Sequence, residues 1–136
     1  FLEMISGLLR KDGRVYITVP AYSILWSDQD VSAGHFRRYN RKAICAVMER
    51  AGYRIEFASY IFRILPLPIA LLRALPYRLG FASAGNSDRD AEREHAASGG
   101  TVSQLMEFAL RPEIRNLRKG RRMRFGGSCL VVACNG

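Results

Sequence analysis

A short apolar segment that ends at a proline, together with the reactive loop after it, constrains the fold of this chain most. Residues 13–20 read Gly-Arg-Val-Tyr-Ile-Thr-Val-Pro. Apolar residues on both faces are typical of a parallel strand covered by helices on both sides, and Pro20 ends the strand because it cannot donate a ladder hydrogen bond. Ligands of open α/β sheets bind just beyond the carboxyl ends of such strands. The sequence therefore predicts a substrate site in residues 21–39.

Apolar periodicity predicts the elements around this strand. Apolar pairs at helical spacing predict a helix over residues 1–10. Asn40 is suited to begin a second helix that Gly52 ends, and alternation over residues 53–57 predicts a strand near the edge of a sheet. The apolar run 128–134 predicts a buried last strand. We therefore expect an α/β fold.

The order of these elements predicts an incomplete domain. The 136 residues are enough for one domain with a core. We expect residues 1–136 to form part of one, with a helix-strand-loop-helix-strand core at 1–60, a variable region with an apolar lid and a mobile loop at 61–110, and a basic segment with a final strand at 111–136. No strand with a Gly-rich turn precedes residue 14 to hold a nucleotide-like cofactor. We therefore expect the chain to begin in the middle of a domain.

Residues 61–81 are apolar but are not typical of a membrane span. The segment is about as long as the roughly 20 apolar residues that a span needs. It contains three arginines and three prolines, however, and these are costly in a membrane or divide a helix. We expect a short helix over residues 68–75 that packs as a lid on the substrate side of the sheet. Contact with a membrane surface is the alternative.

The next two segments contain a loop and a helix in our prediction. Residues 82–100 are small, polar and charged, which is typical of a mobile surface loop. Residues 102–110 predict a helix that stops at Pro112 because proline breaks a helix interior.

The positive charge is concentrated near the C-terminus. The chain has 21 Lys and Arg against 12 Asp and Glu, a net charge of +9, and residues 111–136 contain seven basic residues and one acidic residue. Such a cluster can bind the phosphates of RNA or of anionic lipid, although a solvated surface also explains it. We favour lipid over RNA, because the cluster shares the chain with the apolar segment 61–81. The basic run consists of Arg111, Arg115, Arg118, Lys119, Arg121, Arg122 and Arg124.

The cysteines predict a reducing compartment. Cys45, Cys129 and Cys134 are three in number and lack Cys-x-x-Cys spacing, which argues against a disulfide framework. We therefore expect a cytoplasmic location, or one at the periphery of the membrane.

Several motifs together resemble one enzyme family. The turn Arg10-Lys-Asp-Gly13 precedes the strand Arg-Val-Tyr-Ile-Thr-Val-Pro, and a Trp-Ser-x-x-Asp motif at 26–30 and a Gly-His-x-Arg-Arg-Tyr motif at 34–39 follow it. With the final Gly-Gly-Ser-Cys-Leu-Val-Val-Ala at 126–133, these residues resemble the C-terminal half of a class I S-adenosylmethionine-dependent methyltransferase of type 11/12.

The resemblance implies a fold and a cofactor. The fold would be the C-terminal half of a Rossmann-like sheet, with parallel strands and a final strand inserted antiparallel to the others. The intact enzyme would use S-adenosylmethionine, but the Gly-rich loop and the acidic residue that hold it are absent from this segment. The segment would supply the loop that binds the methyl acceptor, and alone it would be inactive.

Individual residues of the loop are candidates for the chemistry. His35 can act as a general base that accepts a proton from a hydroxyl or amine acceptor near neutral pH. Arg38, or its neighbour Arg37, can bind a carboxylate or phosphate through a two-pronged guanidinium, while one of the two can instead pair with Asp30. We also assign Trp26, Asp30 and Tyr39 to acceptor binding. The sequence does not identify the acceptor, and a small molecule, a lipid-linked intermediate and a glycan precursor all remain open.

Three further hypotheses remain open at the level of sequence. Asp28 and Asp30 could share a divalent cation, as the Asp-x-Asp motif of many glycosyltransferases does. The chain could also be a stand-alone binding module without catalytic activity. Finally, half of a sheet exposes the strand edge meant for the other half, which predicts self-association through that edge.

Overall fold

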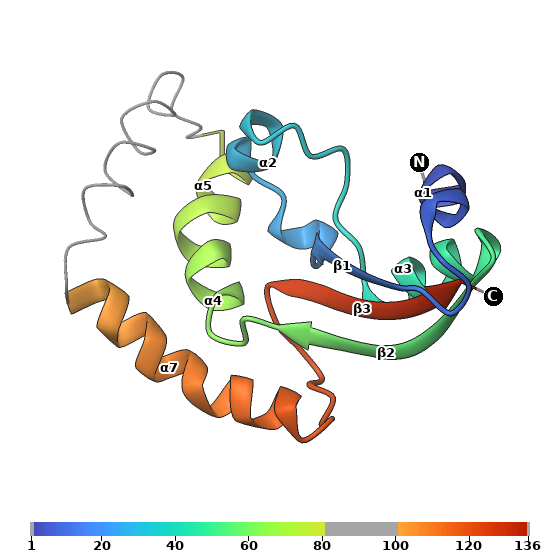
Figure 1. The fold of residues 1–136 in the computed structure, drawn as a ribbon. Helices are drawn as coiled ribbons and strands as arrows, with labels where there is room; N and C mark the ends of the chain where they lie inside the picture. The colour runs from blue at the N-terminus through green and yellow to red at the C-terminus, as the bar shows by residue number, and fades with distance from the viewer. Residues whose placement is uncertain (1, 81–100, 136) are drawn as a thin grey trace.

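The computed structural model describes residues 2–80 and 101–135 (Figure 1). In these residues the strands β1 (Arg14–Pro20), β2 (Tyr53–Ile61) and β3 (Ser128–Asn135) form one sheet in the order β1-β3-β2. β3 pairs antiparallel with both neighbours, Pro20 and Ile61 each lying opposite Ser128. The fold is mixed α/β, as the sequence predicts.

The sheet differs from the parallel Rossmann-like sheet that we expected. Every pair of neighbouring strands in residues 2–80 and 101–135 is antiparallel. β1 and β2 run in the same direction as each other, because both are antiparallel to β3, but β3 separates them. The last strand takes the centre, and its apolar side chains are removed from water there.

The core lies on one face of β3. Cys129, Val131 and Ala133 alternate along the strand and are fully buried. They pack with residues of β1, β2 and the helix α3 (Arg41–Arg50), among them Ile44 and Met48. The side chain of Asn40 accepts a hydrogen bond from the backbone N–H of Ala43 at 2.8 Å, which confirms the predicted helix start. β3 is therefore the predicted buried strand, and β2 lies at an edge.

Helix α1 (Leu2–Leu8) lies at the end of the sheet where β1 begins and β3 ends (Figure 1). The Tyr53 hydroxyl donates to the carbonyl of Leu2 at 2.8 Å, and the Ser6 hydroxyl donates to the side chain of Asn135 at 2.6 Å. The first bond joins the first helix to β2, and the second joins it to the last strand.

One face of β1 is exposed, which corrects the prediction that helices cover both faces of this strand. Val15, Ile17 and Val19 are half-buried, whereas Tyr16 is 69% exposed. No further strand among the described residues pairs with the outer edge of β1. The described residues thus bury only part of the apolar surface of β1.

The predicted short lid helix is longer than residues 68–75. A continuous helical segment consists of α4 (Pro66–Ile69), the π-helical turn η2 (Ala70–Ala74) and α5 (Leu75–Arg78). Its first prolines lie in the opening turn, where backbone N–H groups lack helical partners anyway. Ahead of Pro76, the N–H of Leu75 donates to the carbonyl of Ala70, five residues back. The wider turn accommodates the proline ring, so the prolines do not divide the segment.

Helix α7 (Thr101–Arg118) continues through Pro112, where we predicted its end. A proline inside a helix costs about 3 kcal/mol or more. The next residue, Glu113, is buried, and its carboxylate accepts the backbone N–H groups of Phe62 and, at 3.1 Å, of Arg63. This tertiary contact holds the second half of the helix and helps to offset the cost of the proline.

Two other expectations concern a membrane span and the loop at residues 82–100. In the described ranges no helix is long and apolar enough to cross a membrane. The loop predicted for residues 82–100 lies outside the described residues.

Candidate functional site

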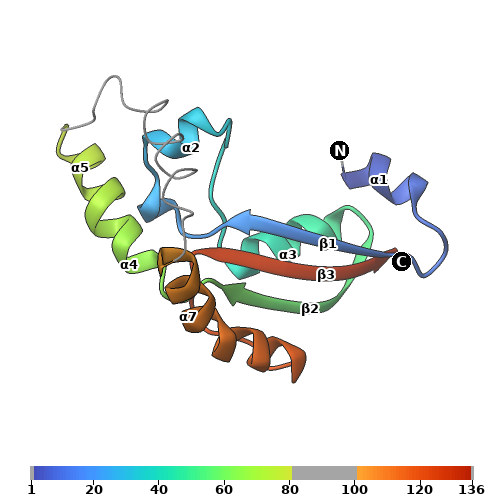
Figure 2. The ribbon, with the colours of Figure 1, turned by 60° about the vertical axis from the view of Figure 1, so that its left-hand side comes forward.

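The carboxyl ends of β1 and β2 lie at the same end of the molecule, because both strands run antiparallel to β3. Residues 21–39, here called the acceptor loop, leave β1 at this end. They contain the 3₁₀ turn η1 (Ser23–Leu25) and the short helix α2 (Asp28–Ser32). The helix formed by α4, η2 and α5 leaves β2 at the same end and lies beside the loop, η1 contacting η2 (Figures 1 and 2). The loop and this helix thus lie next to each other at one end of the sheet.

The two ends of the acceptor loop are hydrogen-bonded to each other. The backbone N–H of Tyr39 donates to the carbonyl of Pro20 at 2.9 Å, and that of Tyr22 donates to the carbonyl of Tyr39 at 3.0 Å. Ala21 and Tyr39 form a parallel bridge that continues the line of β1. The loop is therefore closed at its base.

Asp30 is the centre of the loop and is only 2% exposed. The backbone N–H of Ser27 donates to its Oδ2 at 3.0 Å, and the backbone N–H of Asp30 donates to the carbonyl of Ser27. This is the capping-box arrangement, in which the third helical residue satisfies the N-terminal N–H. The Ser-x-x-Asp spacing was the sequence signal for it.

Arg38 forms a two-point ion pair with Asp30. Its Nε lies 2.9 Å from Oδ1, and its Nη2 lies 2.9 Å from Oδ2, while Nη1 donates to the carbonyl of Ala21 at 3.1 Å. The side chain of Arg38 is 9% exposed. Three guanidinium nitrogens thus bind groups of the chain itself, and the role of Arg38 is to hold the loop rather than to grip an acceptor anion.

His35 contacts the same carboxylate, at the oxygen Oδ1 that also binds the Nε of Arg38. Gly34 has a φ of 68°, a conformation that favours glycine, and this turn brings the Nδ1 of His35 to 3.2 Å from Asp30 Oδ1. Nδ1 is the donor if Asp30 is ionised, since a carboxylate only accepts, and the neutral ring then has its lone pair on Nε2. The side chain of His35 is 44% exposed. The histidine is therefore the oriented and accessible group of the loop.

The charge of Asp30 is maintained by its partners. Burial raises the pKa of this carboxyl, but hydrogen bonds from Arg38, His35 and Ser27 outweigh burial, so that the pKa lies below its ordinary value. The site therefore holds an ionised carboxylate between a guanidinium and an imidazole.

Trp26 and Tyr39 are both half-buried and flank this cluster along the chain. The hydroxyl of Tyr39 accepts a hydrogen bond from the Nε of Arg37 at 2.6 Å, and the guanidinium of Arg37 lies 4.5 Å from the centre of the Tyr39 ring. Arg37 is exposed and is the arginine of the pair that faces solvent.

Tyr22 and Tyr60 are part of the site but were not among the predicted residues. Their rings stack at 5.2 Å between centres, and Tyr22 has a φ of 57°, which is uncommon for tyrosine. Burial, followed by a hydrogen bond with Tyr60, raises the pKa of Tyr22 to about 12. The position of Tyr22 at the start of the loop was the only feature of the sequence that placed it near the site. No feature of the sequence placed Tyr60 there, because Tyr60 lies on β2, far from the loop in the chain.

The geometry does not favour a cation between Asp28 and Asp30. Residues two apart on a helix do not face each other, and here Asp28 is exposed whereas Asp30 is buried. Both oxygens of Asp30 face a guanidinium, whose charge opposes a metal ion. The described residues contain no group of three or more His, Cys, Asp or Glu side chains that could hold a metal.

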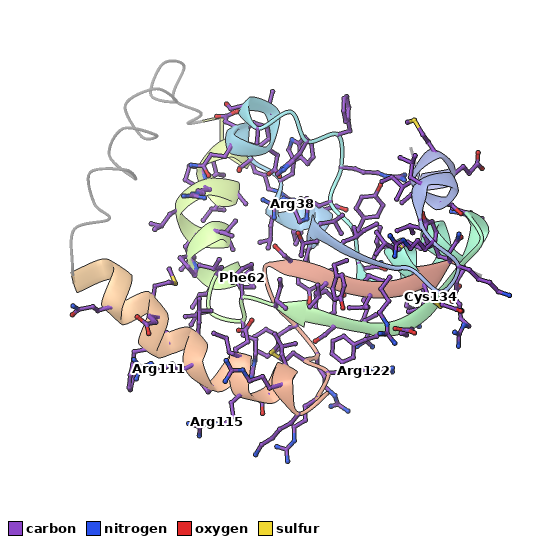
Figure 3. The ribbon with its side chains drawn as sticks, viewed as in Figure 1. Arg38, Phe62, Arg111, Arg115, Arg122 and Cys134 are labelled. Carbon is purple, nitrogen blue, oxygen red and sulfur yellow. The ribbon has the colours of Figure 1, made fainter. Side chains whose placement is uncertain are left out.

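The basic run lies elsewhere. All seven of its side chains are exposed, on the second half of α7 and in the segment that leads to β3. Arg111 and Arg115 project from α7, away from Arg38 (Figure 3). Arg111 pairs with Glu107, and Arg122 lies 5.8 Å from the centre of the Phe57 ring.

A surface cavity of about 280 Å³ lies between α7 and the residues that follow β2. The Arg63 guanidinium lies 4.8 Å from the centre of the Phe125 ring at its wall. None of the predicted site residues lines this cavity, which is lined by Arg63, Ile64, Ala109, Pro112, Glu113, Asn116 and Phe125.

Three of the five predicted residues, Asp30, His35 and Arg38, are thus in direct contact through one carboxylate. Tyr39 contacts Arg37 instead, and Trp26 is half-buried next to Ser27 in the chain. Comparison of the chain with protein-family models, with curated proteins and with solved structures gives no match.

Proposed function

We propose that this chain is the acceptor-side part of an S-adenosylmethionine-dependent methyltransferase. The observation that carries the proposal is the convergence of two separate motifs on Asp30. Ser27 belongs to the Trp-Ser-x-x-Asp motif, whereas His35 and Arg38 belong to the Gly-His-x-Arg-Arg-Tyr motif. The backbone N–H of Ser27 and the side chains of His35 and Arg38 all contact this one carboxylate. The motifs that suggested the family thus make a single cluster.

The order of the strands also supports the proposal. The family resemblance implies a final strand that is inserted antiparallel to the others. β3 is the last strand of the chain and lies antiparallel between β1 and β2, which share one direction. Because both carboxyl ends then lie together, residues of the acceptor loop and of the lid helix gather where a ligand of an α/β sheet is expected.

The described residues do not fit the cofactor itself. Positive-φ glycines among them are Gly34, Gly52, Gly80 and Gly120, and none lies in a turn that leads directly from a strand into a helix. S-adenosylmethionine, held by other residues, would supply a methyl group that its sulfonium already activates. We assign the described residues only to the acceptor.

In this proposal each residue of the cluster has a distinct role. His35 accepts the proton of a hydroxyl or amine acceptor at Nε2. Asp30 orients the ring through Nδ1, and Arg38 balances the buried charge of Asp30 and closes the loop on Ala21. Positioning of the acceptor dominates this type of reaction, so rigidity of the loop is its main contribution.

The coding sequence upstream of Phe1 gives the sharpest test. We expect it to encode a strand followed by a Gly-x-Gly turn, and we expect the 136-residue chain alone to bind S-adenosylmethionine weakly or not at all in calorimetry. Micromolar binding by this chain would contradict the division into a donor half and an acceptor half.

A further inference from the structure

Five exposed leucines lie along the helix formed by α4, η2 and α5 and the residue that follows it. The series 67, 71, 75 and 79 advances by four residues, so these side chains follow one side of the helix. The opposite side contains the buried Ala74 and the half-buried Ile69 and Tyr77. We call the exposed side the leucine face, and it consists of Leu67, Leu71, Leu72, Leu75 and Leu79.

The acceptor loop exposes further apolar side chains at the same end of the molecule. Phe36 is 97% exposed, and Ile24 and Val31 are also exposed. Ile24 belongs to η1, which contacts η2, and both views place α2 near α5 (Figures 1 and 2). Scattered apolar residues are normal on a surface, but a group of this kind at one end marks an interaction site.

The segment that contains the leucine face carries charge of one sign. Residues 61–80 contain no Asp or Glu and three arginines. Arg63, before the helix, and Arg78, at its end, are exposed. Apolar side chains flanked by exposed arginines match a bilayer whose surface carries anionic headgroups. A second copy of the chain is a poor match, since it would bring the same arginines against each other.

We propose that the leucine face lies in the surface of an anionic lipid bilayer and thereby places the acceptor loop against the membrane. The helix formed by α4, η2 and α5 is not long and apolar enough to cross the bilayer, which agrees with a helix in the plane of the interface. The membrane part of this inference is independent of the enzymatic proposal. Its consequence for chemistry rests on the proposed function: of the acceptor classes left open, the lipid-linked one fits a loop at the membrane surface.

Vesicle sedimentation with the 136-residue chain tests the inference. One set of vesicles contains phosphatidylcholine alone, and the other contains phosphatidylcholine mixed with phosphatidylglycerol. We expect binding to the mixed vesicles and much weaker binding to the neutral ones, because the arginines are attracted to the anionic headgroups.

Substitutions on the leucine face should weaken this binding. We expect the double variant Leu71→Gln and Leu72→Gln to bind mixed vesicles about tenfold or more weakly, because less apolar surface leaves water. Leu8→Gln is the matched control, since Leu8 is 82% exposed and lies on α1 at the other end of the sheet. It should bind as the unaltered chain does.

A second pair of variants tests the charge. Arg78→Gln should weaken binding to mixed vesicles by about fivefold, whereas Arg10→Gln, an exposed arginine near α1, should have little effect. Circular dichroism establishes that each variant keeps its helical content. All substituted side chains are exposed, so unfolding is not expected.

Several outcomes would overturn the inference. One is the absence of binding to mixed vesicles, and another is equal loss of binding in Leu8→Gln and in the leucine-face variant. A third is a stable dimer in sedimentation that the leucine-face variant abolishes, since a second copy would then be the occupant. Vesicle binding is measured without S-adenosylmethionine, so a failure here leaves the methyltransferase proposal standing, and a failure of cofactor or activity tests leaves the membrane surface standing.

Discussion

Arg38 and Asp30 are joined at two points, Nε to Oδ1 and Nη2 to Oδ2, each at 2.9 Å, inside a loop where both side chains are shielded from water. The same carboxylate accepts hydrogen bonds from the Nδ1 of His35 and from the backbone N–H of Ser27. One buried ion pair thus fixes both the path of the acceptor loop and the orientation of its histidine. The following predictions separate these two roles and test the surfaces around them.

Removal of the Asp30 carboxylate should destabilise the chain strongly. In Asp30→Ala the guanidinium of Arg38 remains buried without its partner, and breaking such a pair costs about 3 kcal/mol. Denaturant unfolding followed by circular dichroism measures the loss. The control is Glu56→Ala, which breaks the exposed pair with Arg14 and should change stability little. Equal losses in the two variants would contradict a special role for the buried pair.

Acid should remove the contribution of Asp30 to stability. The folded pKa lies below the unfolded pKa of about 3.9, so the stabilisation is fully present above that value and is lost as the pH falls from it through the folded pKa. Thermal unfolding of the unaltered chain and of Asp30→Asn should therefore differ most near neutral pH and less in strong acid. A difference that stays constant from about pH 7 to about pH 3 would show that the charge is not the stabilising feature.

His35 should affect turnover rather than folding. In a complete enzyme that contains this chain, His35→Ala should lower methyl transfer by about tenfold or more, which is about 1.4 kcal/mol of transition-state stabilisation per factor of ten. The side chain of His35 is partly exposed and contacts the Asp30 carboxylate rather than the backbone, so thermal stability should change little. Incorporation of labelled methyl groups and cofactor affinity are measured together.

The control for this experiment is Arg121→Ala, an exposed residue of the basic run. It should retain turnover. If it loses as much as His35→Ala does, or if His35→Ala loses cofactor affinity instead, the assignment of the loop to the acceptor fails. Arg38→Ala, which we first expected to affect acceptor binding, should now reduce stability as Asp30→Ala does.

Glu113 should be required for docking of α7. Its carboxylate accepts two backbone N–H groups, those of Phe62 and Arg63, and these donors would lose their partner in Glu113→Ala. We expect a loss of about 1–3 kcal/mol in the free energy of unfolding. Glu107→Ala on the same helix removes only an exposed pair with Arg111 and should have little effect. Similar unfolding curves for the two variants would argue against this anchor.

The outer edge of β1 should cause self-association. Tyr16 is exposed on this strand, and no described strand pairs with its outer edge. Unpaired edges invite pairing with another chain, and a charge on the edge opposes it. Sedimentation should show oligomers of the unaltered chain and more monomer in Thr18→Lys. A cooperative monomer at all concentrations would contradict this prediction.

Much of the local structure could be predicted from the sequence, because local chemistry determines it. Asn40 and Gly52 mark the ends of α3, and the alternation and final proline mark β1. The motifs at 26–30 and 34–39 located the candidate site. Even the capping box of Ser27 and Asp30 could have been found from its spacing. These features depend on residues within a few positions of each other.

The tertiary structure decided what depends on distant residues. Pro76 predicted a break in the lid helix, but a π-helical turn accommodates the proline ring. Pro112 predicted the end of a helix, but α7 continues, and Glu113 binds it to the residues after β2. No local pattern places β3 between β1 and β2 or leaves Tyr16 exposed. The two arginines at 37 and 38 are equivalent in sequence. Only the tertiary structure pairs Arg38 with Asp30 and leaves Arg37 on the surface. The physical reason is that a buried charge is stable only beside a charge of opposite sign.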